Sequence, residues 1–222
     1  MHNSLENLKL IKKKVNKIIL EKHLKTNPNI IVVTKTFPFD NFKSIFDSGH
    51  IHFGENKIQE AESKWGNLKN LNKNVKLHMI GKLQSNKAKK AIELFDYIHS
   101  LDNERLASKL SKYQNELNKK VNLFIQVNLG QESQKSGIDL KVLNNFYNYC
   151  VNDLSLNVIG LMCLPPMESN SIQYFKILKD NSDKLNLKDL SMGMSSDYED
   201  AISSGSTFIR IGSAILGNRN TT

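Results

Sequence analysis

The sequence predicts an α/β protein of one domain, a (β/α)8 TIM barrel with an extra N-terminal helix. Eight short apolar runs alternate with longer segments of helical periodicity, which is typical of a parallel sheet with crossover helices. Most of these runs are continuously apolar, as expected for strands that are buried on both faces. The length of 222 residues lies near the lower end of the range for this barrel. An open doubly wound sheet would favour a glycine-rich turn after the first strand, whereas Thr-Lys-Thr-Phe-Pro stands there.

The first expected element is an amphipathic helix over residues 4–23. Its apolar side chains fall on one stripe, with lysines opposite: Leu5, Leu8, Ile11, Val15, Ile18 and Ile19. The first strand, 30–34, is a run of β-favouring apolar residues that ends at a threonine. Seven further apolar runs predict strands at 51–53, 77–80, 97–99, 123–127, 158–163, 189–192 and 208–211.

The segments between these strands have helical periodicity. They predict helices over 40–48, 56–65, 85–95, 103–119, 140–152, 169–184 and 196–204. Asp102 or Asn103 is expected to cap the helix at 103, and Asp139 the helix at 140. Because no low-complexity or Pro/Gly-rich linker interrupts the pattern, residues 1–222 are expected to form a single domain, with 217–222 as a short tail.

The composition indicates a soluble globular protein, with 39% hydrophobic and 24% charged residues. No apolar stretch reaches the length of a membrane span, and the N-terminal residues lack the apolar core of a signal peptide. Cys150 and Cys163 are too few for a disulfide framework and lack metal-site spacing, which indicates reduced thiols in a cytoplasmic protein. The net charge of +9 comes from lysines spread along nearly every helix, so no specific nucleic-acid surface and no membrane partner are expected.

Lys35 closes the first predicted strand. A half-buried amine loses solvation when it is protonated, so its pKa tends to fall, and a neutral amine can attack a carbonyl to form a Schiff base. The simpler interpretation is a lysine that marks the strand end and points into water. The residues at the other strand ends decide between the two.

Binding and catalytic residues of a parallel barrel gather at the C-terminal ends of its strands. The sequence places polar side chains or glycines at these ends: Lys35; His52, Gly54, Glu55 and Asn56; His78 and Gly81; His99 and Ser100; Gln126 and Asn128; Cys163; Ser191 to Ser195; and Arg210, Gly212 and Ser213. Taken singly, each has a structural explanation, since glycines permit tight turns, Asn56 and Ser195 can cap helices, and buried histidines are commonly hydrogen-bonded core residues. Their convergence on one rim favours a functional site.

The last two strand ends favour an anion site. The segment 191–195, Ser-Met-Gly-Met-Ser, leads directly into a predicted helix, and the segment 211–214, Ile-Gly-Ser-Ala, leads into a final short turn. In such barrels the loops after strands seven and eight often bind phosphate through backbone N–H groups, small side chains and helix N-termini. A phosphate is therefore expected near Ser195, Gly212 and Ser213.

Arg210 leaves the last strand and is expected to face inward. An arginine cannot be deprotonated, so against a ring nitrogen it would keep that nitrogen unprotonated. Pairing with Glu55 or another carboxylate is the alternative. A Schiff-base lysine, a phosphate cradle and an inward arginine together describe a pocket for pyridoxal 5′-phosphate (PLP).

The motifs of the chain match those of a known family in order over almost the whole length. They are Val33-Thr34-Lys35-Thr36; Phe53-Gly54-Glu55-Asn56 with Gln59-Glu60; Leu83-Gln84-Ser85-Asn86-Lys87; Gln126-Val127-Asn128 with Glu132, Lys135 and Gly137; Ser191-Met192-Gly193-Met194-Ser195; and Arg210-Ile211-Gly212. With these motifs the chain resembles the pyridoxal-phosphate homeostasis proteins, single-domain relatives of the N-terminal barrel of alanine racemase. It departs from the family pattern at Leu77, Met79 and Lys82, of which Lys82 adds charge beside the pocket mouth.

The resemblance implies a set of cofactor-binding residues. Lys35 should carry PLP as a Schiff base, Asn56 should lie near the ring, Arg210 near the ring nitrogen, and the two serine-rich segments around the phosphate. The full expected set is Lys35, Asn56, Ser191, Met194, Ser195, Arg210, Gly212 and Ser213, with no metal ligand and no catalytic residue.

The resemblance also implies a role in PLP homeostasis without robust turnover, with PLP-dependent apo-enzymes or amino acids as recipients. Racemisation needs an acid/base group on each face of the substrate α-carbon, and the two-domain racemases supply one from a C-terminal β-domain that this sequence does not contain. A monomer is therefore expected. The alternatives are a fold-type-III racemase or decarboxylase with a second base among Tyr97, His78 and His99, and a basic protein that associates with nucleic acid.

Overall fold

The strands of the computed structural model, which describes residues 3–130, 136–166 and 170–217, form a closed barrel. Each strand pairs in parallel with the next along the chain, and β8 pairs with β1 to close the sheet. The predicted (β/α)8 barrel is therefore confirmed. The strands are β1 Asn29–Val33, β2 His52–Glu55, β3 Lys76–Met79, β4 Tyr97–Leu101, β5 Asn122–Val127, β6 Val158–Cys163, β7 Asp189–Ser191 and β8 Phe208–Ile211.

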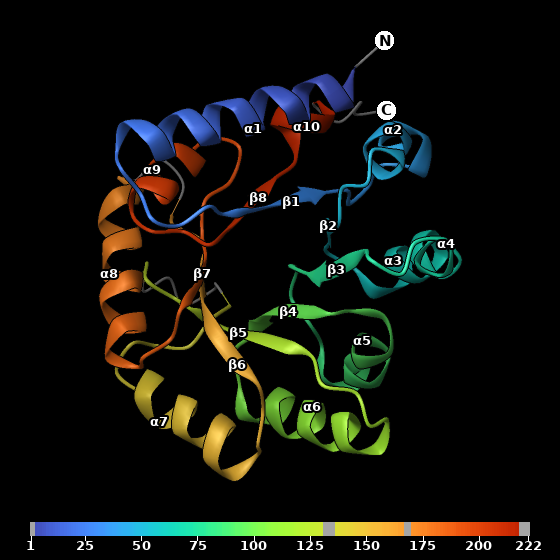
Figure 1. The fold of residues 1–222 in the computed structure, drawn as a ribbon. Helices are drawn as coiled ribbons and strands as arrows, with labels where there is room; N and C mark the ends of the chain where they lie inside the picture. The colour runs from blue at the N-terminus through green and yellow to red at the C-terminus, as the bar shows by residue number, and fades with distance from the viewer. Residues whose placement is uncertain (1–2, 131–135, 167–169, 218–222) are drawn as a thin grey trace.

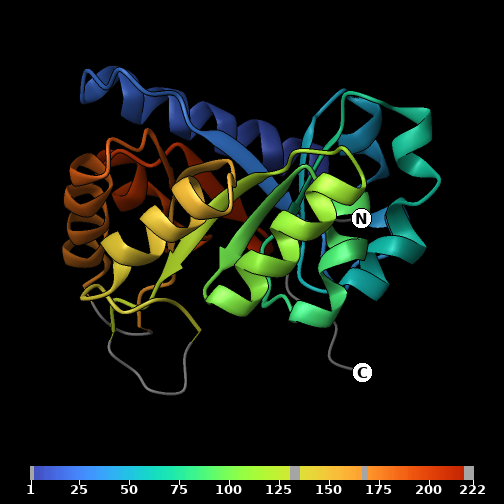
Figure 2. The same ribbon diagram turned by 90° about the horizontal axis from the view of Figure 1, so that it is seen from below.

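Helices surround this barrel on its outer side (Figure 1). They are α1 Ser4–Glu21, α2 Lys43–Asp47, α3 Ile58–Trp65, α4 Leu68–Leu71, α5 Ala88–Leu94, α6 Glu104–Glu116, α7 Leu143–Asn148, α8 Ser171–Lys184, α9 Tyr198–Ser203 and α10 Ser213–Leu216. The extra helix α1 packs beside α9 and α10, on the opposite side of the barrel from α6 and α7 (Figures 1 and 2). Among the described residues, no helix combines the length and the apolar character that a membrane span requires.

Two helices differ from the prediction because turns of other kinds replace part of their predicted length. The predicted helix 40–48 is a 3-10 turn, Phe39–Asn41, followed by α2, because Phe42 between them turns inward and stacks on Trp65 at 5.5 Å between ring centroids. The helix predicted from 140 begins at Leu143 and ends in a π-helical turn, Tyr149–Asp153. Asp139 accepts a hydrogen bond from the N–H of Lys141 in the preceding turn instead of capping this helix.

Other boundaries follow local capping. Asn103 caps α6 as predicted, with its side-chain oxygen 2.8 Å from the N–H of Leu106. α3 begins at Ile58, so Asn56 lies in the loop after β2 and not in a helix. The short helices α4 and α10 were not predicted as helices. The predicted start of α8 at Ser169 lies outside the described residues, as do Glu132 and Lys135, and α8 itself is capped by Asn170.

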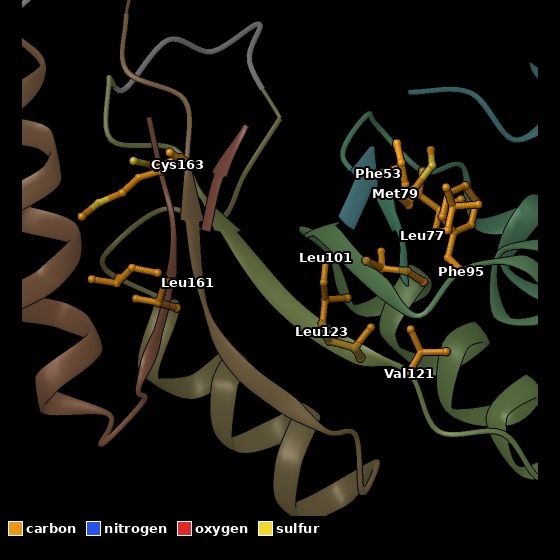
Figure 3. Packing of buried hydrophobic residues seen from close by; sticks show 14 of the residues in the cluster. Phe53, Leu77, Met79, Phe95, Leu101, Val121, Leu123, Leu161 and Cys163 are labelled. Carbon is orange, nitrogen blue, oxygen red and sulfur yellow. The ribbon is translucent and has the colours of Figure 1, made fainter. Parts of the chain in front are cut away.

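The core has two layers because successive side chains of a strand point to opposite faces. The larger layer lies between strands and helices, where Figure 3 shows side chains of β2 to β6 and their flanking segments: Phe53, Leu77, Met79, Phe95, Leu101, Val121, Leu123, Leu161 and Cys163. The smaller layer fills the inside of the barrel with Ile31, Phe124, Met162 and Phe208. Three histidines share this inner space, an unusual filling for a barrel whose interior is usually aliphatic.

Candidate functional site

A cavity of about 520 Å³ lies at the C-terminal ends of the strands, a volume within the usual range of small-molecule sites. The barrel brings seven of the eight expected cofactor-binding residues to its wall: Lys35, Asn56, Met194, Ser195, Arg210, Gly212 and Ser213. The rest of the wall consists of Val33, Phe37, Ile80, Leu164, Ser196 and Gly217. The convergence arises because the loops after β1, β2, β3, β6, β7 and β8 meet at one face of a parallel barrel.

Lys35 follows β1 directly and lines the cavity half-buried. Its backbone turns sharply at Thr36, which has a φ of 66°, a conformation that side-chain-bearing residues rarely adopt. Two hydrogen bonds hold this turn, from the Thr36 N–H to the carboxylate of Glu60 and from the Thr36 hydroxyl to the carbonyl of Lys35 at 2.6 Å. The turn therefore fixes the point from which the lysine side chain starts.

Glu55 lies on the outer face of the barrel, fully buried beneath α3. Its Oε1 accepts hydrogen bonds from Thr34 Oγ1 at 2.6 Å, Lys64 Nζ at 2.8 Å and Trp65 Nε1 at 2.9 Å. Lys64 also donates to the carbonyl of Thr34 at 2.7 Å. This network joins α3 to the residue before Lys35, and it shows that Glu55 pairs with Lys64 and not with Arg210. The sequence reveals the motif but not this arrangement.

Arg210 points into the barrel from β8 and is 5% exposed. Its Nη1 donates to Ser191 Oγ at 2.6 Å and its Nη2 to the carbonyl of Cys163 at 2.9 Å. Within the part of the chain that the structure describes, no carboxylate forms an ion pair with it. Burial lowers the pKa of Arg210 below its usual range, but a guanidinium keeps its proton at neutral pH. The cavity floor is therefore a buried cation held by neutral acceptors.

Ser191, the eighth residue of the expected set, does not line the cavity, so its direct contact with a cofactor stays a prediction. The side chain is fully buried, and its hydroxyl lies between Arg210 Nη1 and His99 Nδ1, which is 2.8 Å away. β7 does point this residue inward, but one layer deeper than the cavity wall. Its hydroxyl contacts Arg210, which does line the cavity.

The turn after β7 faces the start of α10. Ser195 Oγ accepts hydrogen bonds from the N–H groups of Gly212 and Ala214, both at 3.3 Å. Gly193 makes the turn possible with a φ of 91°, and a Cβ there would lie 2.5 Å from the Cβ of Ala201. Because these hydrogen bonds are long, the same backbone N–H groups could donate stronger hydrogen bonds to an anion in the cavity.

Asn56 is placed by a close backbone contact. A Cβ at Gly81 would lie 2.3 Å from the carbonyl oxygen of Asn56, so only glycine lets the loop after β3 pack against the loop after β2. Asn56 also borders a neighbouring hollow of about 420 Å³, whose wall includes Lys82 and Lys87. The Leu83–Lys87 motif therefore borders the candidate site and does not line its cavity.

The inward histidines form a chain beneath the cavity. His52 Nδ1 lies 2.9 Å from His78 Nε2, and His78 Nδ1 lies 2.9 Å from His99 Nε2. Burial lowers the pKa of His52 to about 4 and places the pKa of His78 and His99 well below 6.5. The cavity wall includes neither these three histidines nor Tyr97. The histidines occupy the positions expected of hydrogen-bonded core residues.

Comparisons with known proteins identify the family and the fold of the chain. A family model described as the alanine racemase N-terminal domain matches residues 7–220. The pyridoxal phosphate homeostasis protein of Haemophilus influenzae is 33% identical over 229 residues, which cover 98% of this chain and 97% of the relative. PipY of Synechococcus elongatus, solved with PLP bound, is 32% identical with a TM-score of 0.79, covering 91% of this chain and 100% of PipY.

The alanine racemase of Clostridium difficile shares the barrel with a TM-score of 0.67 and 12% identity, over 96% of this chain and 58% of the racemase. At this identity the likeness shows the fold alone. The family model and the curated relative both extend over almost the whole chain. The chain belongs to the alanine racemase N-terminal domain family and, within it, to the pyridoxal phosphate homeostasis proteins.

Proposed function

We propose that residues 1–222 act as one PLP-binding domain that holds the cofactor as a Schiff base on Lys35, in the service of PLP homeostasis. The observation that carries this proposal is the meeting of two side chains in one cavity of about 520 Å³: a half-buried lysine, and a buried arginine that has no carboxylate partner among the described residues. The PLP-bound structure of PipY and the name of the Haemophilus influenzae relative support it.

The wall of the cavity offers a partner for each polar part of PLP. Lys35 supplies an amine for the aldehyde, and Arg210 supplies a fixed cation for the ring nitrogen. Ser195, Gly212 and Ser213 supply hydroxyl and N–H donors for the phosphate. Val33, Phe37 and other apolar side chains form the remaining wall, which suits a flat aromatic ring.

The attachment is a simple condensation. The neutral amine of Lys35 adds to the aldehyde carbon, a C=N bond replaces the C=O bond, and the oxygen leaves as water with the two amine protons. Two reactions free the cofactor from Lys35. Water reverses the condensation, and the amine of a free amino acid takes the place of the lysine nitrogen in the C=N bond. Bound PLP supplies electron-sink chemistry, which the arginine weakens because it leaves the ring nitrogen unprotonated.

We propose that the protein holds PLP without robust turnover. Among the described residues that line the cavity, Lys35 and Arg210 are the ones with ionisable side chains, and an arginine does not exchange protons at neutral pH. A racemase needs an acid/base group on both faces of the α-carbon, and this wall offers one. The relatives are named as homeostasis proteins, which supports the same view.

Spectroscopy tests the attachment. Adding PLP to the wild-type protein should produce a saturable visible absorbance band, and Lys35→Ala should abolish it while far-UV circular dichroism stays unchanged. Lys82→Ala is the matched control, since Lys82 lies beside the cavity without lining it. A band that persists in Lys35→Ala, or that disappears in Lys82→Ala alone, would overturn the assignment.

Incubation with L-amino acids tests the absence of turnover. The expected result is exchange of the cofactor without accumulation of D-amino acid or amine. Sustained formation of either product would favour the fold-type-III enzyme instead.

We further propose a cytoplasmic monomer that passes PLP to apo-enzymes. Two buried free thiols support the cytoplasmic location. Gel filtration tests the monomer, and transfer of PLP to an apo-enzyme tests the delivery.

A further inference from the structure

A continuous hydrogen-bonded chain crosses the inside of the barrel. It runs from Arg210 through Ser191 Oγ, His99, His78 and His52, and each link is between 2.6 and 2.9 Å long. His52 ends the chain at the amino-terminal face, where it lines a second cavity of about 440 Å³. The chain therefore connects the floor of the proposed PLP site to the opposite end of the barrel.

The rings of the chain are held by aromatic contacts. His78 stacks on Tyr97 with ring centroids 4.3 Å apart and planes 11° apart. His99 stacks on Phe124 at 4.3 Å and 18°. Phe208 contacts all three imidazoles from β8, the strand that carries Arg210. These contacts fix the ring planes, so only the positions of the protons remain to be assigned.

Arg210 determines where the protons lie. A guanidinium can only donate, so Ser191 Oγ accepts from Nη1. The Ser191 hydroxyl proton then has one partner at hydrogen-bonding distance among the described residues, His99 Nδ1. If His99 Nδ1 carried a proton instead, the hydroxyl proton would be buried without an acceptor, which is costly. His99 therefore accepts at Nδ1 and carries its proton on Nε2.

The same reasoning continues along the chain. His99 Nε2–H donates to His78 Nδ1, so His78 carries its proton on Nε2 and donates to His52 Nδ1. His52 in turn carries its proton on Nε2. A second proton on any of these rings would place two donors face to face at one link. All three imidazoles are therefore neutral, and all have the same tautomer.

We propose that Ser191 and His99 are positioning residues for Arg210, which orders this chain into a single proton arrangement and is in turn held in place by it. Ser191 supplies one of the two acceptors that the guanidinium has among the described residues, and His99 keeps the hydroxyl oriented to accept. Resting on the proposed function, this arrangement keeps the cation aimed at the ring nitrogen of PLP. The chain thus acts on the cofactor without contacting it.

Long-range ¹H–¹⁵N spectra of the imidazole nitrogens test the proton arrangement without any cofactor. At pH 7 the wild-type protein should show His52, His78 and His99 as neutral rings with the proton on Nε2. In Ser191→Ala the resonance of His99 Nδ1 should shift, because it loses its donor. A charged ring, or a proton on Nδ1 of His99, would overturn the inference. The wild-type spectrum decides this point even if a variant fails to fold.

PLP titration of the same variants tests the effect on Arg210. Ser191→Ala should weaken PLP binding about tenfold, because one hydrogen bond to a charged group is lost, and should shift the absorbance maximum. Ser100→Ala is the matched control. Ser100 follows His99 on β4, and its buried hydroxyl has no hydrogen-bond partner among the described atoms. It should bind PLP as the wild type does.

The outcomes separate the two proposals. If the wild type takes up PLP and Ser191→Ala binds it with the affinity and spectrum of Ser100→Ala, the positioning role is refuted while PLP binding stands. If the wild type takes up no PLP, the proposed function fails, while the imidazole spectra still decide whether Arg210 orders the chain.

Discussion

The protein contains four buried histidines, and from their burial we expect its stability to fall as the pH falls from 7 to 5. They are His50, His52, His78 and His99, with exposed fractions between 0% and 9%. Burial lowers the pKa of His50 and His52 to about 4 and places the pKa of the other two well below 6.5. Below pH 6.5 the unfolded chain binds protons at these positions and the folded chain does not.

The sign and the size of the effect follow from this difference in bound protons. Stability rises with pH wherever the unfolded state binds more protons, so the full stability is present above about pH 6.5 and declines below it. At pH 5.5 an unfolded imidazole is about nine-tenths protonated, which gives slightly more than about 1 kcal/mol per pH unit for each histidine. Four of them give about 5 kcal/mol per pH unit, which is comparable with the whole stability of a typical domain.

Urea unfolding between pH 7 and pH 5 measures this slope, with the buried Trp65, the only tryptophan of the chain, as the fluorescent probe. His50→Gln should reduce the slope near pH 5.5 by about 1 kcal/mol per pH unit, because one titrating group is removed. Ser100→Ala should move the whole curve without changing its slope. A free energy of unfolding that stays constant from pH 7 to pH 5, or an unchanged slope in His50→Gln, would refute the reasoning.

Three further substitutions test other parts of the site. Arg210→Glu should favour the protonated ring nitrogen of bound PLP and change the absorbance band and the exchange with amino acids; unchanged spectra and exchange would count against contact with the ring. Gly193→Ala should lower the free energy of unfolding by about 1–3 kcal/mol more than Gly205→Ala. Both glycines have a φ of 91°, but a Cβ at Gly193 meets a methyl group at 2.5 Å. Equal losses would show that the close contact is relieved. Glu55→Gln should cost about 3–5 kcal/mol in urea unfolding, because the amine of Lys64 keeps the more exposed Glu60 at 3.4 Å but loses its fully buried carboxylate partner. Glu62→Gln removes an exposed partner and should cost less than about 1 kcal/mol; similar costs would contradict the importance of burial.

The fold could be predicted because apolar runs and helical periodicity are local properties of the sequence. Topology then placed the cavity residues, since the ends of parallel strands meet at one face. Lys35, Arg210 and the serine-glycine segments reach the cavity for this reason alone. Their positions needed no knowledge of side-chain packing.

What the sequence did not reveal depends on depth and packing inside the barrel. Ser191 and Ser195 are four residues apart, yet the first lies beneath Arg210 and the second on the cavity wall. The depth at which an inward side chain lies inside the barrel depends on the tilt and register of the strands. The bonds between His52, His78 and His99 likewise join residues on three strands and become visible only when the register is known.

The network around Glu55 was missed for a related reason. Alternation along β2 sends this carboxylate outward, away from the cavity, and its partners come from α3 and from the residue before Lys35. A glutamate beside an expected pocket is easily interpreted as a ligand contact. In the structure it supports the backbone from which the lysine extends.

Reduction with borohydride tests the central claim most directly. Borohydride converts the C=N bond between Lys35 and PLP into a stable amine, so mass spectrometry of the digested protein can locate the bound cofactor. The expected result is a pyridoxyl group on the peptide that contains Lys35, and none in Lys35→Ala. A label on Lys82, Lys87 or Lys135 in place of Lys35, or no label on a protein saturated with PLP, would contradict the account.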